Sequence, residues 1–331
     1  MYFLEKGDKI GIYSPSSPIT ATSPKRFARA KQFLESKGFQ IIEGRLTGKS
    51  DYYRSGSIEE RADELNQLIQ TKDIKMIMST IGGTNSNALL PYIDYDAFKK
   101  NPKIMIGYSD VTAILLAIYA QTGFQVYYGP ALVPSFGEFP PYVDETYRYF
   151  DKMFCQTIQF PFEVPKPQYW TDEGINWERM EREKARRQNH WIGVNGGNAT
   201  GRLIGGNLNT INGFWGSPYM PEIKEGDILL IEDSQKNASQ VEKNFSLLKV
   251  NGVFDRIRGI LLGKHERFDD EGTGRTPLDL LLEVLHGTRV PIIANFDCCH
   301  TQPMLTMPIG AEVSIDANES HPSVWINKLG T

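Results

Sequence analysis

Cysteine is scarce in this sequence of 331 residues, which contains only three. Cys155, Cys298 and Cys299 are too few and too unevenly placed for a disulfide framework, so a reducing compartment is expected. No basic start followed by a long apolar stretch is present, and we therefore expect no signal peptide. No apolar run approaches the ~18 residues that span a bilayer. The sequence predicts a cytoplasmic protein without a membrane partner.

An excess of positive charge is also missing, since 36 Lys and Arg face 40 Asp and Glu for a net charge of −4. A nucleic-acid-binding surface would need a basic excess on one element, so no nucleic-acid partner is expected. Paired histidines and Cys-x-x-Cys spacing are absent, which disfavours a metal site. No G-x-G-x-x-G opens a helix after the first strand, which disfavours a dinucleotide site. We predict no cofactor.

The first half of the sequence alternates short apolar runs with helical patterns. The strands expected there are DKIGIY, FQIIEG, IKMIMS and KIMIGY, and the helices between them begin near Pro24 and Ser57. Ser57 and Glu60 have the spacing of a capping box. Strand and helix in alternation predict a mostly parallel sheet with helices on both faces. We therefore predict an N-terminal Rossmann-like α/β domain over residues 1–155, containing Ser109.

The alternation is lost between residues 156 and 200, which we predict to be a linker or insertion bearing tryptophans. Within it, residues 170–192 have a mixed-charge centre that predicts a helix. Strands are expected again at GDILLIED, RIRGILLG, PIIANFD and AEVSID. Residues 201–331 are thus predicted to form a C-terminal α/β domain with a β-rich, barrel-like core, which also holds Glu232 and His300.

Ser109 and Asp110 lie on a predicted turn between the strand KIMIGY and a helix that is apolar nearly all round. They have two possible uses. Ser and Asp are preferred N-cap residues, and the local pattern favours that use. Alternatively, the turn displays the serine hydroxyl as the nucleophile elbow of a hydrolase does.

Ligands of open α/β sheets bind outside the carboxyl ends of the strands, which makes the strand ends candidate site positions. The strands end in Ser109, in Glu232 and near His300, and these are the parts of a nucleophile, an orienting acid and a base. Glu232 has an alternative use as a strand-end carboxylate with a surface partner. The thiols Cys298 and Cys299 are rival nucleophiles, but no activating helix N-terminus is apparent beside them. The IGGTNSN loop is either a simple turn or a source of N–H groups for an oxyanion.

Several segments together resemble the serine peptidase family of LD-carboxypeptidases. They are IGGTNSNALLPYID, MIGYSDVTA, GRLIGGNLNTI, ILLIEDS and FDCCHTQPMLTMPIGAEVSID, and the resemblance runs from residue 8 to about residue 317. The resemblance implies that Ser109 is the nucleophile and that Glu232 and His300 complete a triad. It also implies an oxyanion hole made by the backbone N–H groups of Gly83 and Asp110, and it reverses the preference for a helix cap.

The family has a murein LD-carboxypeptidase branch and a branch of microcin C immunity peptidases, whose longer insertion carries a tryptophan that stacks on a nucleotide base. The long insertion of this chain, with three tryptophans, resembles the second branch. We assign Trp177 as the stacking residue, although packing of the insertion is the alternative use of these tryptophans. Lys236 is assigned to an acidic group of the substrate, with a solvated lysine as the alternative. Asn85 of the glycine loop is also assigned to substrate binding.

The resemblance implies a serine hydrolase that cleaves the amide-type bond between an aminoacyl or peptidyl group and a nucleotide, without a metal. The partner is then a small peptide or peptidyl-nucleotide substrate, and the chain is expected to form a homodimer. Cleavage of murein tetrapeptides in cell-wall recycling is the alternative within the family. A non-catalytic binder of muropeptides or nucleotides, or a structural two-domain protein, are the alternatives outside it.

Overall fold

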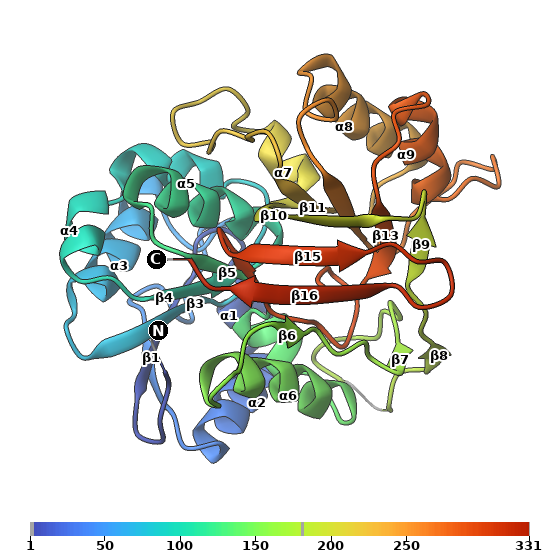
Figure 1. Cartoon of the computed structure of the whole chain (residues 1–331). Helices are drawn as coiled ribbons and strands as arrows, with labels where there is room; N and C mark the ends of the chain where they lie inside the picture. Colours follow the sequence, from blue (N-terminus) through green and yellow to red (C-terminus); the bar gives the residue numbers. More distant parts are fainter. Residues whose placement is uncertain (1–2, 180–181, 331) are drawn as a thin grey trace.

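The computed structural model describes residues 3–179 and 182–330, and its strands build two large sheets that lie side by side (Figure 1). The first sheet has the strand order β14-β5-β4-β3-β1-β2, in which β1 to β5 are parallel and β14 is antiparallel to β5. Its strands are β1 (Lys9–Tyr13), β2 (Gln40–Glu43), β3 (Ile74–Ser79), β4 (Ile104–Gly107), β5 (Val126–Tyr128) and β14 (Met307–Ile309).

Helices form two groups around this sheet. One group contains α3 (Ile58–Gln70), η1 (Ser86–Tyr92), α4 (Tyr95–Lys100) and α5 (Thr112–Thr122), which contact one another. The other contains α2 (Pro24–Ser36), a single π-helical turn at Leu132–Phe136 (η3) and α6 (Tyr142–Phe154). The short helices α1 (Ile19–Thr22) and η2 (Ser109–Val111) follow strand ends.

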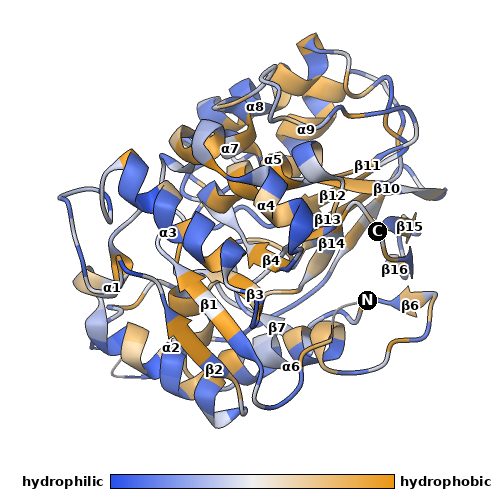
Figure 2. Ribbon diagram, turned by 90° about the vertical axis from the view of Figure 1, so that its left-hand side faces the viewer, coloured by the Kyte–Doolittle hydropathy of each residue, from blue (hydrophilic) through white to orange (hydrophobic). Residues whose placement is uncertain are grey.

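Local signals of the sequence decide where these helices begin and end. Ser57 and Glu60 form the predicted capping box at the start of α3. Helix α5 ends at Gly123, whose φ of 77° suits a residue without a side chain. Figure 2 shows β1 and β3 as largely hydrophobic ribbons, whereas α2 and α3 alternate between hydrophobic and hydrophilic residues. The prediction of a mostly parallel sheet whose strands alternate with helices is confirmed.

The second sheet is mixed and has the strand order β6-β16-β15-β10-β11-β12-β13-β9. Strands β10 to β13 are parallel, and the remaining strands pair in antiparallel fashion. Helices also belong to this half, and Figure 1 shows α8 (Ala238–Val250) and α9 (Pro277–Leu285) at its upper edge. The elements are β6 (Phe162–Glu163), β9 (Ile192–Val194), β10 (Asn198–Asn207), α7 (Leu208–Asn212), β11 (Ile228–Glu232), α8 (Ala238–Val250), β12 (Gly259–Gly263), α9 (Pro277–Leu285), β13 (Ile292–Phe296), β15 (Glu312–Asp316) and β16 (Ser323–Lys328).

The two sheets share one hydrophobic core, because a single cluster of buried side chains includes residues of both. Strand β14 comes from the C-terminal part of the chain, yet it pairs with β5 of the first sheet. The fold is thus mixed α/β, as predicted. No helix among residues 3–179 and 182–330 is long and apolar enough to cross a bilayer.

The prediction of a helical centre in residues 170–192 is wrong for the residues that the structure describes. This segment contains the short strands β7 (Tyr169–Trp170) and β8 (Arg187–Gln188), which pair in antiparallel fashion. Its charged side chains pair across the loop, since Glu173 accepts hydrogen bonds from Arg182 and from the backbone N–H of Ala185. Such cross-loop pairs replace the pairs along one helical face that the mixed charges suggested. Met180 and Glu181 lie outside the described residues.

Candidate active site

Ser109 lies on the turn between β4 and α5, where its backbone has a φ of 63°. This left-handed conformation is costly for a residue with a side chain, so its surroundings must hold it. The Thr112 hydroxyl donates to the Ser109 carbonyl over 2.6 Å, and the Ser109 N–H donates to the Tyr128 hydroxyl over 3.0 Å. The N-cap position of α5 is taken by Val111, whose side chain has no group that could cap the helix. The turn therefore has the geometry of a nucleophile elbow rather than of a helix cap.

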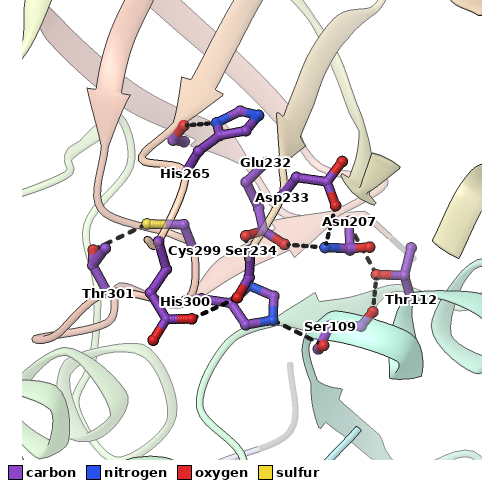
Figure 3. A network of polar contacts seen from close by, with 12 residues as sticks. Ser109, Thr112, Asn207, Glu232, Asp233, Ser234, His265, Cys299, His300 and Thr301 are labelled. Atoms are coloured by element: carbon purple, nitrogen blue, oxygen red, sulfur yellow. Dashed lines mark hydrogen bonds and ion pairs between the residues drawn. The ribbon is translucent and has the colours of Figure 1, made fainter. Parts of the chain in front are cut away.

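A continuous chain of hydrogen bonds joins Ser109 to His300 and His300 to Glu232 (Figure 3). The Ser109 Oγ lies 2.8 Å from His300 Nε2, and His300 Nδ1 lies 2.6 Å from Glu232 Oε2. Glu232 is the last residue of β11 and is fully buried, and His300 follows β13. The arrangement places a base beside a hydroxyl and an acid behind the base, which is the geometry of acyl-transfer triads.

The ionisation of His300 depends on its partner. Burial by itself lowers the pKa of His300, because the charged ring is poorly solvated. The charge of Glu232 and its hydrogen bond to the ring outweigh burial, and the pKa of His300 is raised above its ordinary value. His300 is thus a base strengthened by a buried carboxylate.

Glu232 stays ionised although it is buried. Burial raises the pKa of a carboxyl group, but the nearby His300 and the hydrogen bonds to Glu232 lower it below its ordinary value. Its Oε1 accepts from the Tyr128 hydroxyl over 2.6 Å and from Asn207 Nδ2 over 3.0 Å. The carboxylate therefore has donors on both oxygens, which fixes its orientation toward His300.

A second buried carboxyl group, Asp233, lies next to Glu232. Burial, with the charge of Glu232 adding to it, raises the pKa of Asp233 to about 7. Asn207 Nδ2 also reaches Asp233 Oδ1 over 3.3 Å, and Asn244 Nδ2 donates to Asp233 Oδ2 over 2.9 Å. Two amides thus hold the pair of acidic side chains at the end of β11.

The loop after β3 is tied to the turn that carries Ser109. The Asp110 carboxylate accepts from the backbone N–H groups of Asn85 and Ser86 over 3.0 and 2.9 Å, and from the Ser86 hydroxyl over 2.7 Å. A side chain on Gly82 would lie 3.0 Å from the backbone nitrogen of Asp110 and from Ser109 Cβ. A side chain at this position would therefore push the turn and the loop apart by a few tenths of an ångström.

Gly83 lies in the wall of the space that the Ser109 hydroxyl faces, and Asp110 directly follows Ser109 in the chain. The backbone N–H of neither residue donates a hydrogen bond to another group in the part of the chain that the structure describes. Gly83 has a φ of 152°, and a Cβ there would lie 2.2 Å from Ser16 Oγ. The loop is thus a glycine-dependent structure and more than a simple turn, and the N–H groups of Gly83 and Asp110 are candidate donors to a ligand.

Ser109 and His300 open onto a cavity of about 710 Å³, which is in the range of small-molecule sites. Both halves of the chain and the insertion contribute to its wall. Besides Ser109 and His300, the wall includes Gly82, Gly83, Trp177, Lys184, Asn207, Asn209, Asp233, Lys236, Glu266 and Arg267. Most of these residues are polar or charged, so the cavity suits a polar ligand.

The insertion brings Trp177 to this cavity. The Arg26 guanidinium lies 4.3 Å from the centre of the Trp177 ring. Glu178, the next residue, accepts from the backbone N–H groups of Lys25 and Arg26 over 3.2 Å each, at the start of α2. Because the adjoining residue is anchored to the helix, the indole ring is held at the cavity wall.

The other tryptophans of the insertion pack against the protein body. Trp191 is buried and its Nε1 donates to Asp297 over 2.7 Å. Trp170 lies close to Lys264 and Arg187, whose cationic groups are 5.3 and 5.1 Å from its ring centre. Among the three tryptophans, only Trp177 is part of the cavity wall.

Two further predicted substrate-binding residues differ in their position. Lys236 is part of the cavity wall, and its Nζ has no carboxylate within 4.0 Å among residues 3–179 and 182–330. Asn85 is not part of the wall, because its Oδ1 faces inward and accepts from Ser16 Oγ over 3.0 Å and from Arg61 over 2.6 Å. The structure therefore brings Lys236 to the cavity and does not bring Asn85 there.

The rival thiol nucleophiles are poorly suited to that chemistry. Burial raises the pKa of Cys299 to about 12 and that of Cys298 well above its ordinary value. Both sulfur atoms are fully buried and bond to backbone carbonyls, those of Tyr128 and Phe296 among them. In the described part of the chain, no three His, Cys, Asp or Glu side chains gather as a metal site requires.

The residues that support Glu232 were missed at the level of the sequence. Tyr128 ends β5, the strand beside β4, and Asn207 ends β10, the strand beside β11. Both therefore lie at carboxyl ends of strands adjacent to those of Ser109 and Glu232. The rule that site residues lie at the carboxyl ends of strands can be applied to a sequence. It could not find Tyr128, because β5 is short and has no hydrophobic pattern strong enough to predict a strand.

Comparisons with known proteins agree with this geometry. A model described as the LD-carboxypeptidase N-terminal domain matches residues 10–129, and one described as the LD-carboxypeptidase C-terminal domain matches residues 200–315. A Vibrio cholerae protein that carries the name of a carboxypeptidase is 59% identical, over 95% of this chain and 93% of the relative.

A second relative is the microcin C7 self-immunity protein MccF of Escherichia coli. It is 51% identical over 99% of this chain and 96% of its own length. A solved structure of MccF, in complex with aspartyl sulfamoyl adenosine, superposes with a TM-score of 0.96 at 51% identity, over 99% of this chain and 98% of that one. The resemblance inferred from the sequence is confirmed.

Proposed function

The chain belongs to the LD-carboxypeptidase family and is a serine peptidase-type hydrolase, and on that premise we propose that Ser109, His300 and Glu232 are its catalytic triad. We propose that it cleaves the amide-type bond between an aminoacyl or peptidyl group and a nucleotide. The observation that carries this proposal is the Ser109–His300–Glu232 chain of hydrogen bonds, which opens onto a cavity that Trp177 also borders.

In the proposed reaction His300 removes the proton from the Ser109 hydroxyl while its oxygen attacks the acyl carbon. Glu232 holds the ring and stabilises the imidazolium that forms. The backbone N–H groups of Gly83 and Asp110 receive the negative charge on the carbonyl oxygen. Loss of one such donor typically costs about 3 kcal/mol of transition-state stabilisation.

The tetrahedral intermediate then collapses, and the bond to the nitrogen of the nucleotide part breaks. The imidazolium of His300 gives its proton to this leaving nitrogen, so the ring is neutral again. A water molecule attacks the Ser109 ester by the same sequence of proton transfers, which releases the acid and restores the serine.

The nucleotide is proposed to stack on Trp177. Stacking of a base on an aromatic ring is worth about 1–3 kcal/mol and is tolerant of base identity. Two observations support Trp177: it is the insertion tryptophan at the cavity wall, and Arg26 holds its ring from one side. The aspartyl sulfamoyl adenosine bound by MccF has the corresponding chemistry, an acyl group joined to a nucleoside.

Lys236 is proposed to receive an anionic group of the substrate. It borders the cavity, and no carboxylate of the described chain lies within 4.0 Å of its Nζ. A carboxylate on the acyl part and a phosphoryl or sulfamoyl group are the candidate ligands.

We also propose detoxification of microcin C-type antibiotics as the role, in the cytoplasm and as a homodimer. The printed name of the Escherichia coli relative, a self-immunity protein, supports the role. Protection of a sensitive strain by the expressed protein, and its loss with Ser109→Ala, would test the role. Light scattering of the purified protein tests the dimer.

The enzymatic test compares wild type with Ser109→Ala on two substrates, an aminoacyl-sulfamoyl adenosine and an L,D-linked murein tetrapeptide. We expect wild type to cleave the nucleotide conjugate and the variant to be inactive. Release of D-Ala alone would assign the enzyme to the murein branch of the family. Turnover of neither substrate would favour a non-catalytic binder.

A further inference from the structure

The hydroxyl group of Tyr128 joins the two parts of the site that come from different sheets. It accepts from the backbone N–H of Ser109 over 3.0 Å and donates to Glu232 Oε1 over 2.6 Å. We infer that Tyr128 is a positioning residue, which holds the turn of the nucleophile and shares the charge of the acid. This inference rests on the proposed triad.

The position of Tyr128 suits this bridge. It is the last residue of β5 and pairs with Gly107 at the end of β4, two residues before Ser109. Glu232 ends β11 in the second sheet. Tyr128 is fully buried, so water does not compete for either hydrogen bond. One oxygen atom thus connects the strand ends of both sheets.

The directions of the two hydrogen bonds follow from what a phenol can do. A tyrosine hydroxyl has a single proton to donate and lone pairs to accept with. Since the Ser109 N–H occupies a lone pair, the proton is given to Glu232. The first bond secures a backbone nitrogen of a residue at φ 63°, and the second is a short bond to a charged acceptor. Removal of the Tyr128 hydroxyl would therefore have two effects at once: it would loosen the turn of Ser109 and change the basicity of Glu232.

The second effect has a predictable sign. Glu232 accepts from Tyr128 and Asn207 on Oε1 and faces His300 through Oε2. Without the hydrogen bond from Tyr128, the Glu232 carboxylate is less stabilised as an anion. It therefore holds a proton more strongly, whether that proton is on His300 or on Glu232 itself. The apparent pKa of the coupled pair then rises. The other titratable groups that face this pair are Tyr108, Asp233, His265, Glu266, Cys298 and Cys299.

The test compares Tyr128→Phe with Tyr127→Phe in the full-length enzyme. Tyr127 is the preceding residue of the same strand, is also buried, and its ring packs on Phe154 away from the triad. For Tyr128→Phe we expect kcat to fall by about 10- to 100-fold, as for a reacting group displaced by a fraction of an ångström. KM changes little, and the acid limb of kcat/KM moves to higher pH. Tyr127→Phe keeps the wild-type kcat and pH profile.

A spectroscopic measurement makes the result independent of substrate. The low-field proton resonance of His300 Nδ1–H, assigned by its absence from His300→Ala, is expected to shift in Tyr128→Phe and not in Tyr127→Phe. If wild type cleaves neither substrate, the proposed function fails, but this resonance still decides the role of Tyr128.

An unshifted resonance, or an unmoved acid limb with activity lowered equally at every pH, would overturn the inference. Site-specific 3-fluorotyrosine at position 128 covers the case in which Tyr128→Phe does not fold. It retains both hydrogen bonds and makes the hydroxyl a stronger donor, so we expect the acid limb to move to lower pH. Movement in the other direction would contradict the inference.

Discussion

The proposed triad and the insertion loop, described over residues 171–179 and 182–187, face the same cavity but are held in different ways. Glu232 is fully buried, and hydrogen bonds from strand-end residues surround it and Ser109. About half of the described loop residues are exposed, and charged contacts hold the loop. These include Glu178 at the start of α2 and the ion pair of Lys184 with the buried Glu138, at 2.7 Å.

This difference separates two tasks. Bond cleavage needs atoms fixed to within a fraction of an ångström, and the packed ends of two sheets provide that. Recognition of the nucleotide part needs only an aromatic surface in roughly the right place, and a loop with a few anchors can supply it. Substitutions at the strand ends are therefore expected to change kcat, whereas substitutions in the loop change KM.

The largest effect is expected from Glu232→Gln. Removal of the orienting charge of a triad lowers kcat by about 10⁴-fold. Wild type loses activity as the pH falls through the raised pKa of His300, because the protonated ring is no base. In the variant burial remains without the carboxylate, so the pKa of His300 drops and the acid limb moves to lower pH. A pH–rate profile checks this, with the exposed Glu312→Gln as the control; an acid limb that stays in place would contradict the role of Glu232.

A smaller loss of kcat is expected from Gly83→Ala. The added Cβ would lie 2.2 Å from Ser16 Oγ, so the loop must move and its N–H is displaced from the cavity. Loss of one oxyanion donor lowers kcat by about 10²–10³-fold. Gly48→Ala is the matched control, since Gly48 has a φ of 75° but no atom near a Cβ. If Gly83→Ala and Gly48→Ala have equal kcat values, displacement of the Gly83 N–H has no effect of its own on kcat. Gly83 would then not be an oxyanion donor.

Trp177→Ala tests whether the insertion loop recognises the nucleotide part of the substrate. If the base stacks on this ring, its removal raises KM for the nucleotide conjugate by about 5- to 150-fold, which corresponds to 1–3 kcal/mol. We expect kcat to change much less. Trp325→Ala, in β16 between β6 and β15 of the second sheet, controls for the loss of a tryptophan, because Trp325 is not part of the cavity wall. Unchanged KM values in steady-state assays would assign Trp177 to packing on Arg26.

The smallest effect is expected from Glu178→Gln, which weakens one anchor of the loop. A carboxylate at a helix N-terminus is worth about 0.3–1 kcal/mol, so KM should rise by a few-fold at most. Glu183→Gln is the matched control, because Glu183 belongs to the same loop and its carboxylate pairs with the exposed Arg186, at 3.3 Å, instead of with a helix N-terminus. A large drop in kcat for Glu178→Gln would show that the loop also positions the reacting atoms, and the separation of tasks would then be wrong.

Many of the helices and parallel strands could be predicted, because their signals lie in contiguous residues. Periodicity and the Ser57 capping box predict the helices, and the apolar runs predict the parallel strands. The rule that ligands bind at carboxyl ends then selects Ser109, Glu232 and the region of His300. The interior of residues 170–192 was predicted wrongly, because its Glu173 pairs with Arg182 across the loop instead of along a helix.

The sequence by itself determined the α/β alternation, the turn that carries Ser109 and the family of the chain, since each is written in contiguous residues. Only the tertiary structure decided whether Ser109 caps a helix or faces His300, because that depends on a contact between residues 191 positions apart. It likewise decided that Asn85 faces Arg61, that Trp177 reaches the cavity and that Tyr128 connects both sheets. Contacts between distant segments arise when the two sheets pack together, and no local pattern of residues encodes that packing.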